Sequence, residues 1–272
     1  MVNGFVPASL AEALEIRAAH NVVPYAGGTD LMVENRQGVD YLFLNKLAEL
    51  QTITEEESSI RIGAGATFTK ALESPLVPAL MKEAVRGIAA PAIRNAGTFG
   101  GNLGNGSAKA DSVLIEYVAD AKIVLRSVRG ERVLPVAAFY QGRKKLDLAA
   151  DELIVAILLP KTGLERYVYQ KVGGRNALAI SRVSFAGVFA EEKGVITNCA
   201  AAFGAVADTV LRWPDLESML VGKTVEQARA VKEDYLRACS ERMVLTRGRV
   251  SAEYRKTVCM NLLNDFLTQF GI

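Results

Sequence analysis

Five glycines fall within eleven residues of this chain, Ala96-Gly97-Thr98-Phe99-Gly100-Gly101-Asn102-Leu103-Gly104-Asn105-Gly106. They lie in a longer segment, residues 89–111, without sustained helical or strand periodicity, so we expect a loop there. Long loops inside a compact domain are usually functional or disordered, and this segment has too little charge for a solvated linker. Its glycines let the backbone approach a ligand, and successive N–H groups suit phosphate oxygens. The segment is therefore typical of a diphosphate-binding loop.

Polar side chains in and near this segment fit the same interpretation. Thr98 and Asn102 offer hydrogen bonds, and Arg94 is the nearest fixed positive charge. Tight turns alone also require glycines, so this segment taken by itself leaves a purely structural role open.

A second glycine pair follows a predicted strand near the N-terminus. Residues 22–25 form the strand, which runs into Ala26-Gly27-Gly28-Thr29-Asp30-Leu31. Two strand-adjacent Gly-Gly loops, each with a neighbouring threonine, predict a cofactor whose diphosphate lies between them. Neither loop matches G-x-x-x-x-G-K-[ST] or a helix-opening G-x-G-x-x-G, and Gly63-Ala64-Gly65 is typical of a strand.

Composition excludes several classes of protein. The chain has 272 residues, of which 50% are hydrophobic and 23% charged, as expected for a globular protein of two or three domains. Its 32 basic and 30 acidic residues give a net charge of +2, which favours neither nucleic acid nor an anionic membrane as partner. The longest apolar runs have strand length, so we expect no transmembrane segment. Residues 1–7 do not resemble an export signal, so we expect a cytoplasmic protein.

The chain is poor in side chains that bind metals or act as nucleophiles. It has one histidine, His20, and its three cysteines, Cys199, Cys239 and Cys259, have neither metal-site nor disulfide-framework spacing. We expect these cysteines to be reduced and buried. No metal site is expected, and no side chain is assigned a catalytic role. Redox chemistry would come from an organic cofactor.

The order of predicted elements indicates an α+β fold rather than a doubly wound sheet. Strands dominate the middle of the chain, and two long helices, beginning near Thr224 and Ser251, close it. Pro160-Lys161-Thr162-Gly163 is the predicted domain boundary.

Four stretches together resemble the FAD-binding medium subunit of molybdenum hydroxylases, the xanthine dehydrogenase and carbon monoxide dehydrogenase type of enzymes. These stretches are residues 26–31, Pro91-Ala92-Ile93-Arg94-Asn95, Thr98-Phe99-Gly100-Gly101-Asn102-Leu103 and Ser251-Ala252-Glu253-Tyr254-Arg255. The resemblance implies a vanillyl-alcohol-oxidase-like (PCMH-type) FAD-binding domain over residues 1–162, with subdomains of about 1–54 and 55–162. It also implies a C-terminal α+β domain over residues 163–272, with a three-stranded antiparallel sheet and helices.

The resemblance also implies which residues bind non-covalent FAD. They are Ala26, Gly27, Gly28, Thr29, Asp30, Leu31, Thr98, Gly100, Gly101, Asn102, Asp111, Ile154 and Lys171. For two of them the sequence alone leaves a structural role open. Asp111 has the position of a charge at a helix N-terminus, and Lys171 that of a solvated strand end.

Two departures from the family pattern are visible. The family usually has Ser-Pro before its aspartate, whereas this chain has Ser107-Ala108-Lys109-Ala110-Asp111. Where relatives often carry Asp-Ile-Ala, this chain has Ala179-Ile180-Ser181, so a carboxylate expected near the flavin is missing.

The resemblance further implies partners and a place in electron transfer. A large subunit would bind the molybdenum cofactor and a small subunit two [2Fe-2S] clusters, from which FAD passes electrons to NAD or another acceptor. Two alternatives stay open: a self-contained flavin oxidoreductase of the same fold, and a non-catalytic assembly module that has lost FAD.

Overall fold

The computed structural model describes residues 3–34 and 37–272. Residues 1–2, where the segment considered for an export signal begins, lie outside this part. The chain forms two compact units, which are described separately. Unit 1 comprises Met1–Val77, Ile88–Ser107 and Asp120–Pro160, and unit 2 comprises Pro78–Gly87, Ala108–Ala119 and Lys161–Ile272. The predicted boundary near residue 162 stays a prediction, but the compact units are not continuous in sequence.

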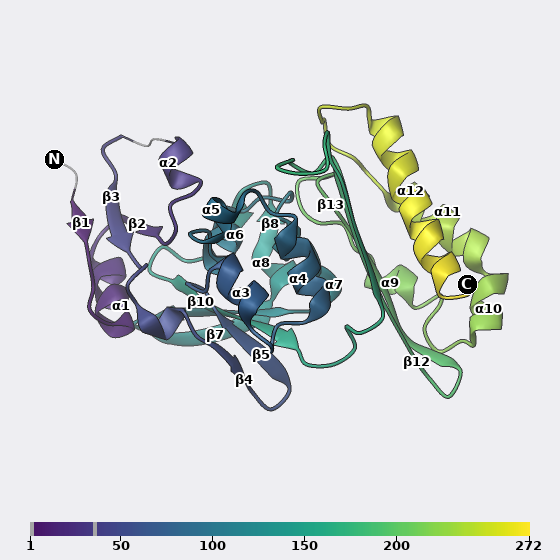
Figure 1. Ribbon diagram of the computed structural model, residues 1–272, viewed down its shortest axis with the longest axis horizontal. Coiled ribbons are helices and arrows are strands. Elements are labelled where there is room, and N and C mark those ends of the chain that lie inside the picture. The colour runs from purple at the N-terminus through teal and green to yellow at the C-terminus, as the bar shows by residue number, and fades with distance from the viewer. Residues whose placement is uncertain (1–2, 35–36) are drawn as a thin grey trace. The chain divides into compact units, whose positions relative to one another are not determined.

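Unit 1 contains two principal sheets (Figure 1). A parallel three-stranded sheet has the order β1-β3-β2, and a five-stranded antiparallel sheet has the order β4-β5-β10-β6-β7. The strands are β1 (Gly4–Phe5), β2 (Val22–Tyr25), β3 (Asp40–Phe43), β4 (Ile53–Glu55), β5 (Ser59–Gly63), β6 (Lys122–Ser127), β7 (Gly130–Pro135), β8 (Tyr140–Gly142), β9 (Lys145–Leu146) and β10 (Leu153–Pro160). The helices are α1 (Leu10–Ala19), α2 (Leu31–Glu34), η1 (Ala48–Leu50), α3 (Phe68–Glu73), α5 (Pro91–Arg94), α6 (Phe99–Gly104) and α8 (Val136–Phe139).

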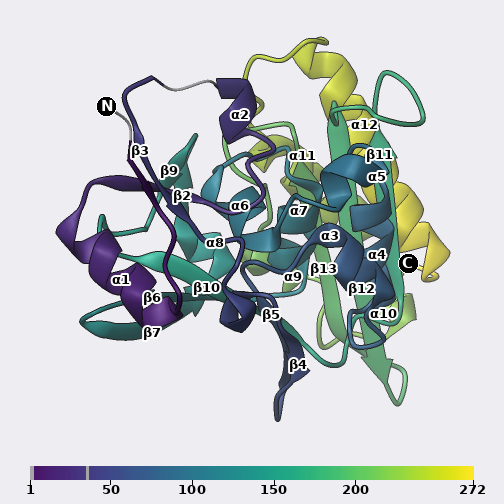
Figure 2. The same ribbon diagram turned by 60° about the vertical axis from the view of Figure 1, so that its left-hand side comes forward.

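Helix α1 packs against both of these sheets. Ser9 caps it by accepting a hydrogen bond from the Glu12 amide, which satisfies one of the unpaired donors of the first turn. Its apolar residues join a buried cluster with residues of β2, β3, β6 and β10, and the helix lies against β6 (Figure 2). This apolar contact holds β2, and the loop that follows it, against the larger sheet.

Unit 2 is built around an antiparallel sheet of three strands, as predicted. The order is β11-β12-β13, with β11 (Tyr167–Val172), β12 (Val183–Glu192) and β13 (Val195–Gly204). The helices are α4 (Ala79–Arg86), α7 (Asp111–Val118), α9 (Pro214–Glu217), α10 (Val225–Ala230), α11 (Lys232–Arg242) and α12 (Ala252–Gln269). Helices α7 and α12 cover opposite faces of the sheet (Figure 1). This mixture of helix and antiparallel sheet confirms the α+β class.

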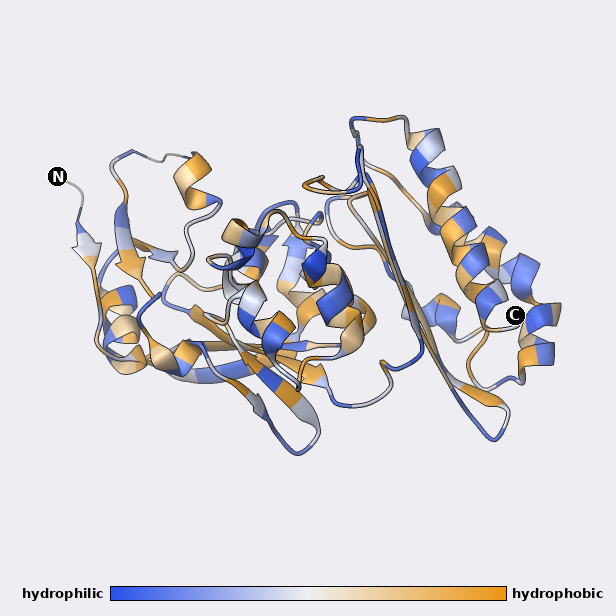
Figure 3. Cartoon of the chain, viewed as in Figure 1, coloured by the Kyte–Doolittle hydropathy of each residue, from blue (hydrophilic) through white to orange (hydrophobic). Residues whose placement is uncertain are grey.

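Successive side chains of β12 point to opposite faces of the sheet, so this one strand contributes to both faces. Phe185 and Phe189 belong to a large apolar cluster that includes Phe266 of α12, with 5.7 Å between the ring centres of Phe185 and Phe266. The ribbon of α12 shows the matching mixture of hydrophobic and hydrophilic residues (Figure 3). Gly187 lies between the two phenylalanines, where a Cβ would be 2.6 Å from the Phe266 ring.

No helix in the described residues is long and apolar enough to cross a membrane.

The segment predicted to be a loop contains two short helices, so that expectation was wrong. Pro91 provides the first residue of α5, where its missing N–H is not needed. Thr98 caps α6, and its hydroxyl accepts a hydrogen bond of 3.1 Å from the amide of Gly101. Glycine is a poor helix former, so local propensity did not reveal α6.

Glu116 of α7 is a buried acid whose charge should make stability depend on pH. The side chain is fully buried, and burial raises the pKa of Glu116 to about 8, although the nearby Ser112 hydroxyl acts in the opposite direction. We expect Glu116 to be protonated in the folded protein at neutral pH. Its contribution to stability should be complete below pH 4.5, fall as pH rises toward 8, and level off above that.

The variant Glu116→Gln removes this titration and should abolish the associated slope. In the wild type the slope amounts to about 1.4 kcal/mol of unfolding free energy per pH unit at most. Urea unfolding between pH 5 and pH 9 measures it. The matched control is Glu241→Gln on α11, where the side chain is exposed and the slope should persist. Identical slopes in wild type and Glu116→Gln would show that this carboxyl is ionised in the folded state.

Candidate functional site

Unit 1 contains a cavity of about 320 Å³ lined by both predicted glycine loops. We call residues 26–31 the first glycine loop and residues 96–106 the second. Eleven of the thirteen predicted site residues line this cavity: Ala26, Gly27, Gly28, Thr29, Asp30, Leu31, Thr98, Gly100, Gly101, Asn102 and Ile154. Segments about seventy residues apart in the sequence therefore meet at one site, as the glycine pattern predicted.

The two loops touch through their main chains. A Cβ at Gly27 would overlap the carbonyl oxygen of Ala96, so only glycine permits this approach. A second contact joins the loops at the end of α6, where the side-chain amide of Asn105 donates a 2.7 Å hydrogen bond to Asp30. At the other end of α6, a Cβ at Gly100 would lie 2.6 Å from the Cβ of Ala64. These glycines are required by packing, whatever binds in the cavity.

The first glycine loop has unused backbone donors. Within the described residues the N–H groups of Gly27, Gly28 and Thr29 have no hydrogen-bond acceptor. Gly28 adopts a φ of 68°, a left-handed conformation that permits the tight turn, and a Cβ there would overlap the Tyr25 hydroxyl. Successive free N–H groups in such a turn are suited to bind anions.

The second glycine loop differs, because its amides are already used. Phe99 and Gly100 donate to the carbonyl groups of Ala66 and Ala64 at 3.2 and 2.8 Å, and Gly101 donates to Thr98. Gly101 and Gly104 lie one turn apart on the exposed face of α6, and both line the cavity. This loop therefore presents bare helix surface rather than the free amides expected from the sequence.

Ile154 reaches the cavity at an irregularity in β10. The register of β10 against β6 shifts between Ile154 and Ala156, and the carbonyl of Val155 accepts a 3.0 Å hydrogen bond from the Ala64 amide. A β-bulge of this kind redirects side chains next to binding sites. It places Ile154 near α6, with its Cδ1 atom 3.6 Å from the position of a Cβ on Gly104.

The sequence predicted Arg94 as the positive charge of the site, but other cations line the cavity. The guanidinium of Arg94 donates to the carbonyls of Ile88 and Ala89 at 2.6 and 2.9 Å, and Arg94 does not line the cavity. The lining contains Arg17 and Lys144 instead. Sequence reasoning missed both, because Arg17 lies on a helix and Lys144 on a hairpin without a recognisable binding motif.

The remaining two predicted site residues, Asp111 and Lys171, form an ion pair inside unit 2. The Lys171 ammonium donates to Asp111 at 2.6 Å and to the carbonyl of Gly87 at 2.8 Å, and Ser181 donates to Asp111 at 2.9 Å. Burial raises the pKa of Asp111, while Lys171 and Ser181 act in the opposite direction. Lys171 is thus not a solvated strand end, and Asp111 is both the first residue of α7 and a buried partner of Lys171.

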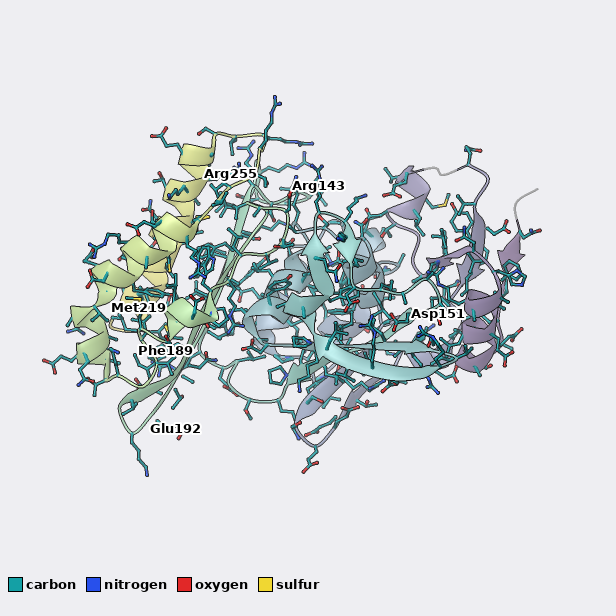
Figure 4. The ribbon with its side chains drawn as sticks, turned by 180° about the vertical axis from the view of Figure 1, so that it is seen from behind. Arg143, Asp151, Phe189, Glu192, Met219 and Arg255 are labelled. Carbon is teal, nitrogen blue, oxygen red and sulfur yellow. The ribbon has the colours of Figure 1, made fainter. Side chains whose placement is uncertain are left out.

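The motif at residues 251–255 has a structural role in unit 2. Ser251 caps α12, and the buried Arg255 donates to the carbonyls of Val206 and Thr246 (Figure 4). Arg255 therefore ties the chain before α12 to the segment that follows β13. The three cysteines are free and buried, and burial raises their thiol pKa values.

Two family models match the chain, one for each part. Residues 1–162 match the FAD binding domain in molybdopterin dehydrogenase, and residues 168–270 match the CO dehydrogenase flavoprotein C-terminal domain.

Curated relatives align over almost the whole chain. The putative xanthine dehydrogenase FAD-binding subunit of Escherichia coli (strain K12) is 33% identical over 96% of this chain and 93% of its own length. The nicotinate dehydrogenase FAD-subunit of Eubacterium barkeri is 32% identical, over 97% of this chain and 96% of its own. The carbon monoxide dehydrogenase medium chain of Hydrogenophaga pseudoflava is 29% identical, over 86% and 85%.

Solved structures agree with the sequence comparisons. A chain of the Hydrogenophaga pseudoflava carbon monoxide dehydrogenase that lacks the Mo-pyranopterin moiety superposes with a TM-score of 0.87 at 26% identity, covering 98% of this chain and 96% of that one. A chain of the cyanide-inactivated Cu,Mo-CO dehydrogenase gives 0.87 at 25% identity, with 97% and 95% covered. The resemblance found in the sequence is confirmed: the chain belongs to the family of FAD-binding medium subunits of molybdopterin dehydrogenases, oxidoreductases of the xanthine and carbon monoxide dehydrogenase type.

Proposed function

We propose that this chain binds FAD in the cavity of unit 1 and transfers electrons from [2Fe-2S] clusters of a small partner subunit to NAD or another acceptor. A large partner subunit would bind the molybdenum cofactor. The observation that carries the proposal is the meeting of two bare main-chain segments at one cavity, within a chain of the FAD-binding family.

The residues of the cavity fit FAD. The cavity volume of about 320 Å³ lies at the lower end of small-molecule sites and suits part of this ligand, such as the diphosphate. The free N–H groups at residues 27–29 match phosphate oxygens, and the exposed face of Gly101 and Gly104 lets a flat or extended ligand lie against the backbone. Bound FAD would supply one- and two-electron chemistry that no amino-acid side chain provides.

The chain's own contribution is to bind and orient the cofactor. The first glycine loop would hold the diphosphate through its amides, while Asp30 is kept in place by Asn105. Apolar lining residues, among them Leu44, Leu50 and Leu153, would exclude water from the bound rings. The family pattern also implies a role in flavin binding for Asp111 and Lys171, which form a buried ion pair in unit 2.

Substitutions on the exposed face of α6 test the location of the cofactor. A Cβ at Gly104 has only an ordinary contact to Ile154, and one at Gly101 meets only the Thr98 hydroxyl at 3.0 Å, which a small shift relieves, so neither position is closed to a Cβ by the protein itself. Gly101→Val and Gly104→Val should therefore fold but bind FAD about tenfold more weakly or worse, as measured by flavin fluorescence titration.

The control for these variants is Gly28→Val. It should lower the melting temperature, because a valine there would need a strained φ and would displace Tyr25. Full FAD affinity in both α6 variants would move the site away from the second glycine loop.

The proposed electron transfer is tested on the native assembly. A tagged chain purified from its native host should co-purify with chains that contain molybdenum and iron, and it should release non-covalent FAD on denaturation. Flavin in the purified chain alone should not be reduced by the substrate that reduces the whole assembly. A chain that purifies alone, without those metals, and whose flavin a small substrate reduces directly would instead be a self-contained flavin oxidoreductase.

The variant Asp111→Asn tests whether the ion pair of unit 2 acts on the flavin. Asparagine keeps the shape and the contact with Ser181 but removes a negative charge, so reduction of the flavin should become more favourable. We expect the midpoint potential of the bound flavin to rise by tens of millivolts in a dye-equilibrated titration. An unchanged potential with full FAD binding would give Asp111 a purely structural role.

A further inference from the structure

Lys144 is held at the cavity by an unusual backbone conformation. It lies in the turn between β8 and β9 with a φ of 54°, a left-handed conformation that normally favours glycine. Six non-glycine residues of the described chain have positive φ: Ala89, Asp120, Lys144, Leu178, Lys193 and Ala205. Lys144 is the one among them that lines the cavity. Lys144 thus combines a strained backbone with a place in the cavity lining, which makes its side chain a candidate for a function there.

The position of Lys144 is set by the second glycine loop. Its amide donates a 3.3 Å hydrogen bond to the carbonyl of Gly106. Gly106 has a φ of 65°, and a Cβ there would lie 3.0 Å from the Cα of Lys144. The backbone of the hairpin is thus packed on the end of the loop that carries α6, next to the labelled Arg143 (Figure 4). These main-chain contacts place the backbone of Lys144 independently of the ion pair that its side chain makes.

The charges lining the cavity differ in how firmly they are engaged. Asp30 accepts from Asn105, and Glu152 accepts two hydrogen bonds from Arg132, at 2.6 and 2.8 Å. Arg17 is half-buried and donates to the carbonyls of Val22 and Glu152. The remaining lining charges are Lys144 and Glu34.

Lys144 and Glu34 form a solvent-accessible ion pair. The Lys144 ammonium lies 3.1 Å from the Glu34 carboxylate, and the lysine side chain is 60% exposed. Exposed ion pairs of this kind contribute little to stability, so exchanging one partner costs little. A diphosphate carries more negative charge than one carboxylate and would compete well for the ammonium.

Resting on the proposed function, we propose that Lys144 is a cofactor-binding residue that exchanges Glu34 for the diphosphate of the bound dinucleotide. In the free protein Glu34 holds the ammonium at the cavity. In the bound protein the ammonium donates to a phosphate oxygen and Glu34 is released. Glu34 thus competes with the ligand, and the pair makes affinity depend on charges beyond the two glycine loops.

The two charges should act in opposite directions, which separates this proposal from a structural latch. Lys144→Gln should weaken FAD binding about tenfold, and Glu34→Gln should tighten it about two- to fivefold, in fluorescence titrations at low salt. If the ion pair only held the site together, both variants would weaken binding. That result, or unchanged affinity in Lys144→Gln, overturns the proposal.

Three further measurements isolate the contact between Lys144 and the diphosphate. Glu34→Gln in the Lys144→Gln background should have little effect, because the glutamate acts through the lysine, and an undiminished effect there contradicts the exchange. ADP, used as a competitor of FAD, should lose affinity in Lys144→Gln to the same extent as FAD, whereas an unchanged ADP affinity would contradict a diphosphate contact. The neighbouring Lys145→Gln should bind FAD like the wild type, because Lys145 does not line the cavity, and an equal loss there contradicts a specific role.

Misfolding is controlled by Lys144→Gly. Glycine adopts this φ without strain, so the variant should be at least as stable as the wild type while binding FAD as weakly as Lys144→Gln. Wild-type affinity in Lys144→Gly contradicts the proposal. Failure of the wild type to bind FAD at all would refute the proposed function instead, so the two failures are distinguishable.

Discussion

The site of this protein depends on one close approach between two backbones. Gly27 lies so near the Ala96 carbonyl that no side chain fits between them, and Gly100 lies similarly close to Ala64. Contacts of this kind are available only to glycine, since a single Cβ would force the segments apart. The cavity, the first loop's free amides and the exposed face of α6 all follow from this approach. The glycines therefore serve packing first, and ligand access is its consequence.

The two loops have different physical roles although they look alike in sequence. Within the part of the chain that the structure describes, the first loop has N–H groups without an acceptor, whereas in the second the amides of residues 99–101 donate to Ala66, Ala64 and Thr98. Successive N–H groups of this kind at a cavity are suited to bind an anion. The second loop instead contributes a surface without side chains at Gly101 and Gly104. The first loop thus offers N–H donors, and the second offers a surface for close contact.

Much of the site was predictable from the sequence, because glycines are needed where two backbone segments approach too closely for a Cβ. The meeting of the two loops followed from the spacing of these glycines. The start of a helix after Thr224 was also predicted, but the single long helix expected there is divided into α10 and α11. Helix α6 was not predictable, because tertiary contacts stabilise a segment with poor intrinsic propensity. The prediction that Arg94 supplies the positive charge of the site was wrong for a related reason. The backbone turn at Ala89 brings a carbonyl group within reach of the guanidinium, and Arg94 donates to it instead. Lys144 left no signal, because its position depends on a contact with Gly106 that is distant in sequence.

The path of the chain gives the ion pair of unit 2 a role that sequence could not indicate. The second glycine loop lies in residues 88–107, which belong to unit 1, whereas α4 before it and α7 after it belong to unit 2. The residues that flank segment 88–107 are both held by hydrogen bonds within unit 2. Lys171 donates to the carbonyl of Gly87, and the Ala205 amide donates to the carbonyl of Ala108, each at 2.8 Å. Lys171, fixed in turn by Asp111, therefore anchors the point where the chain leaves unit 2. A residue that the family pattern assigns to the cofactor therefore also has a structural role within unit 2, at the end of α4.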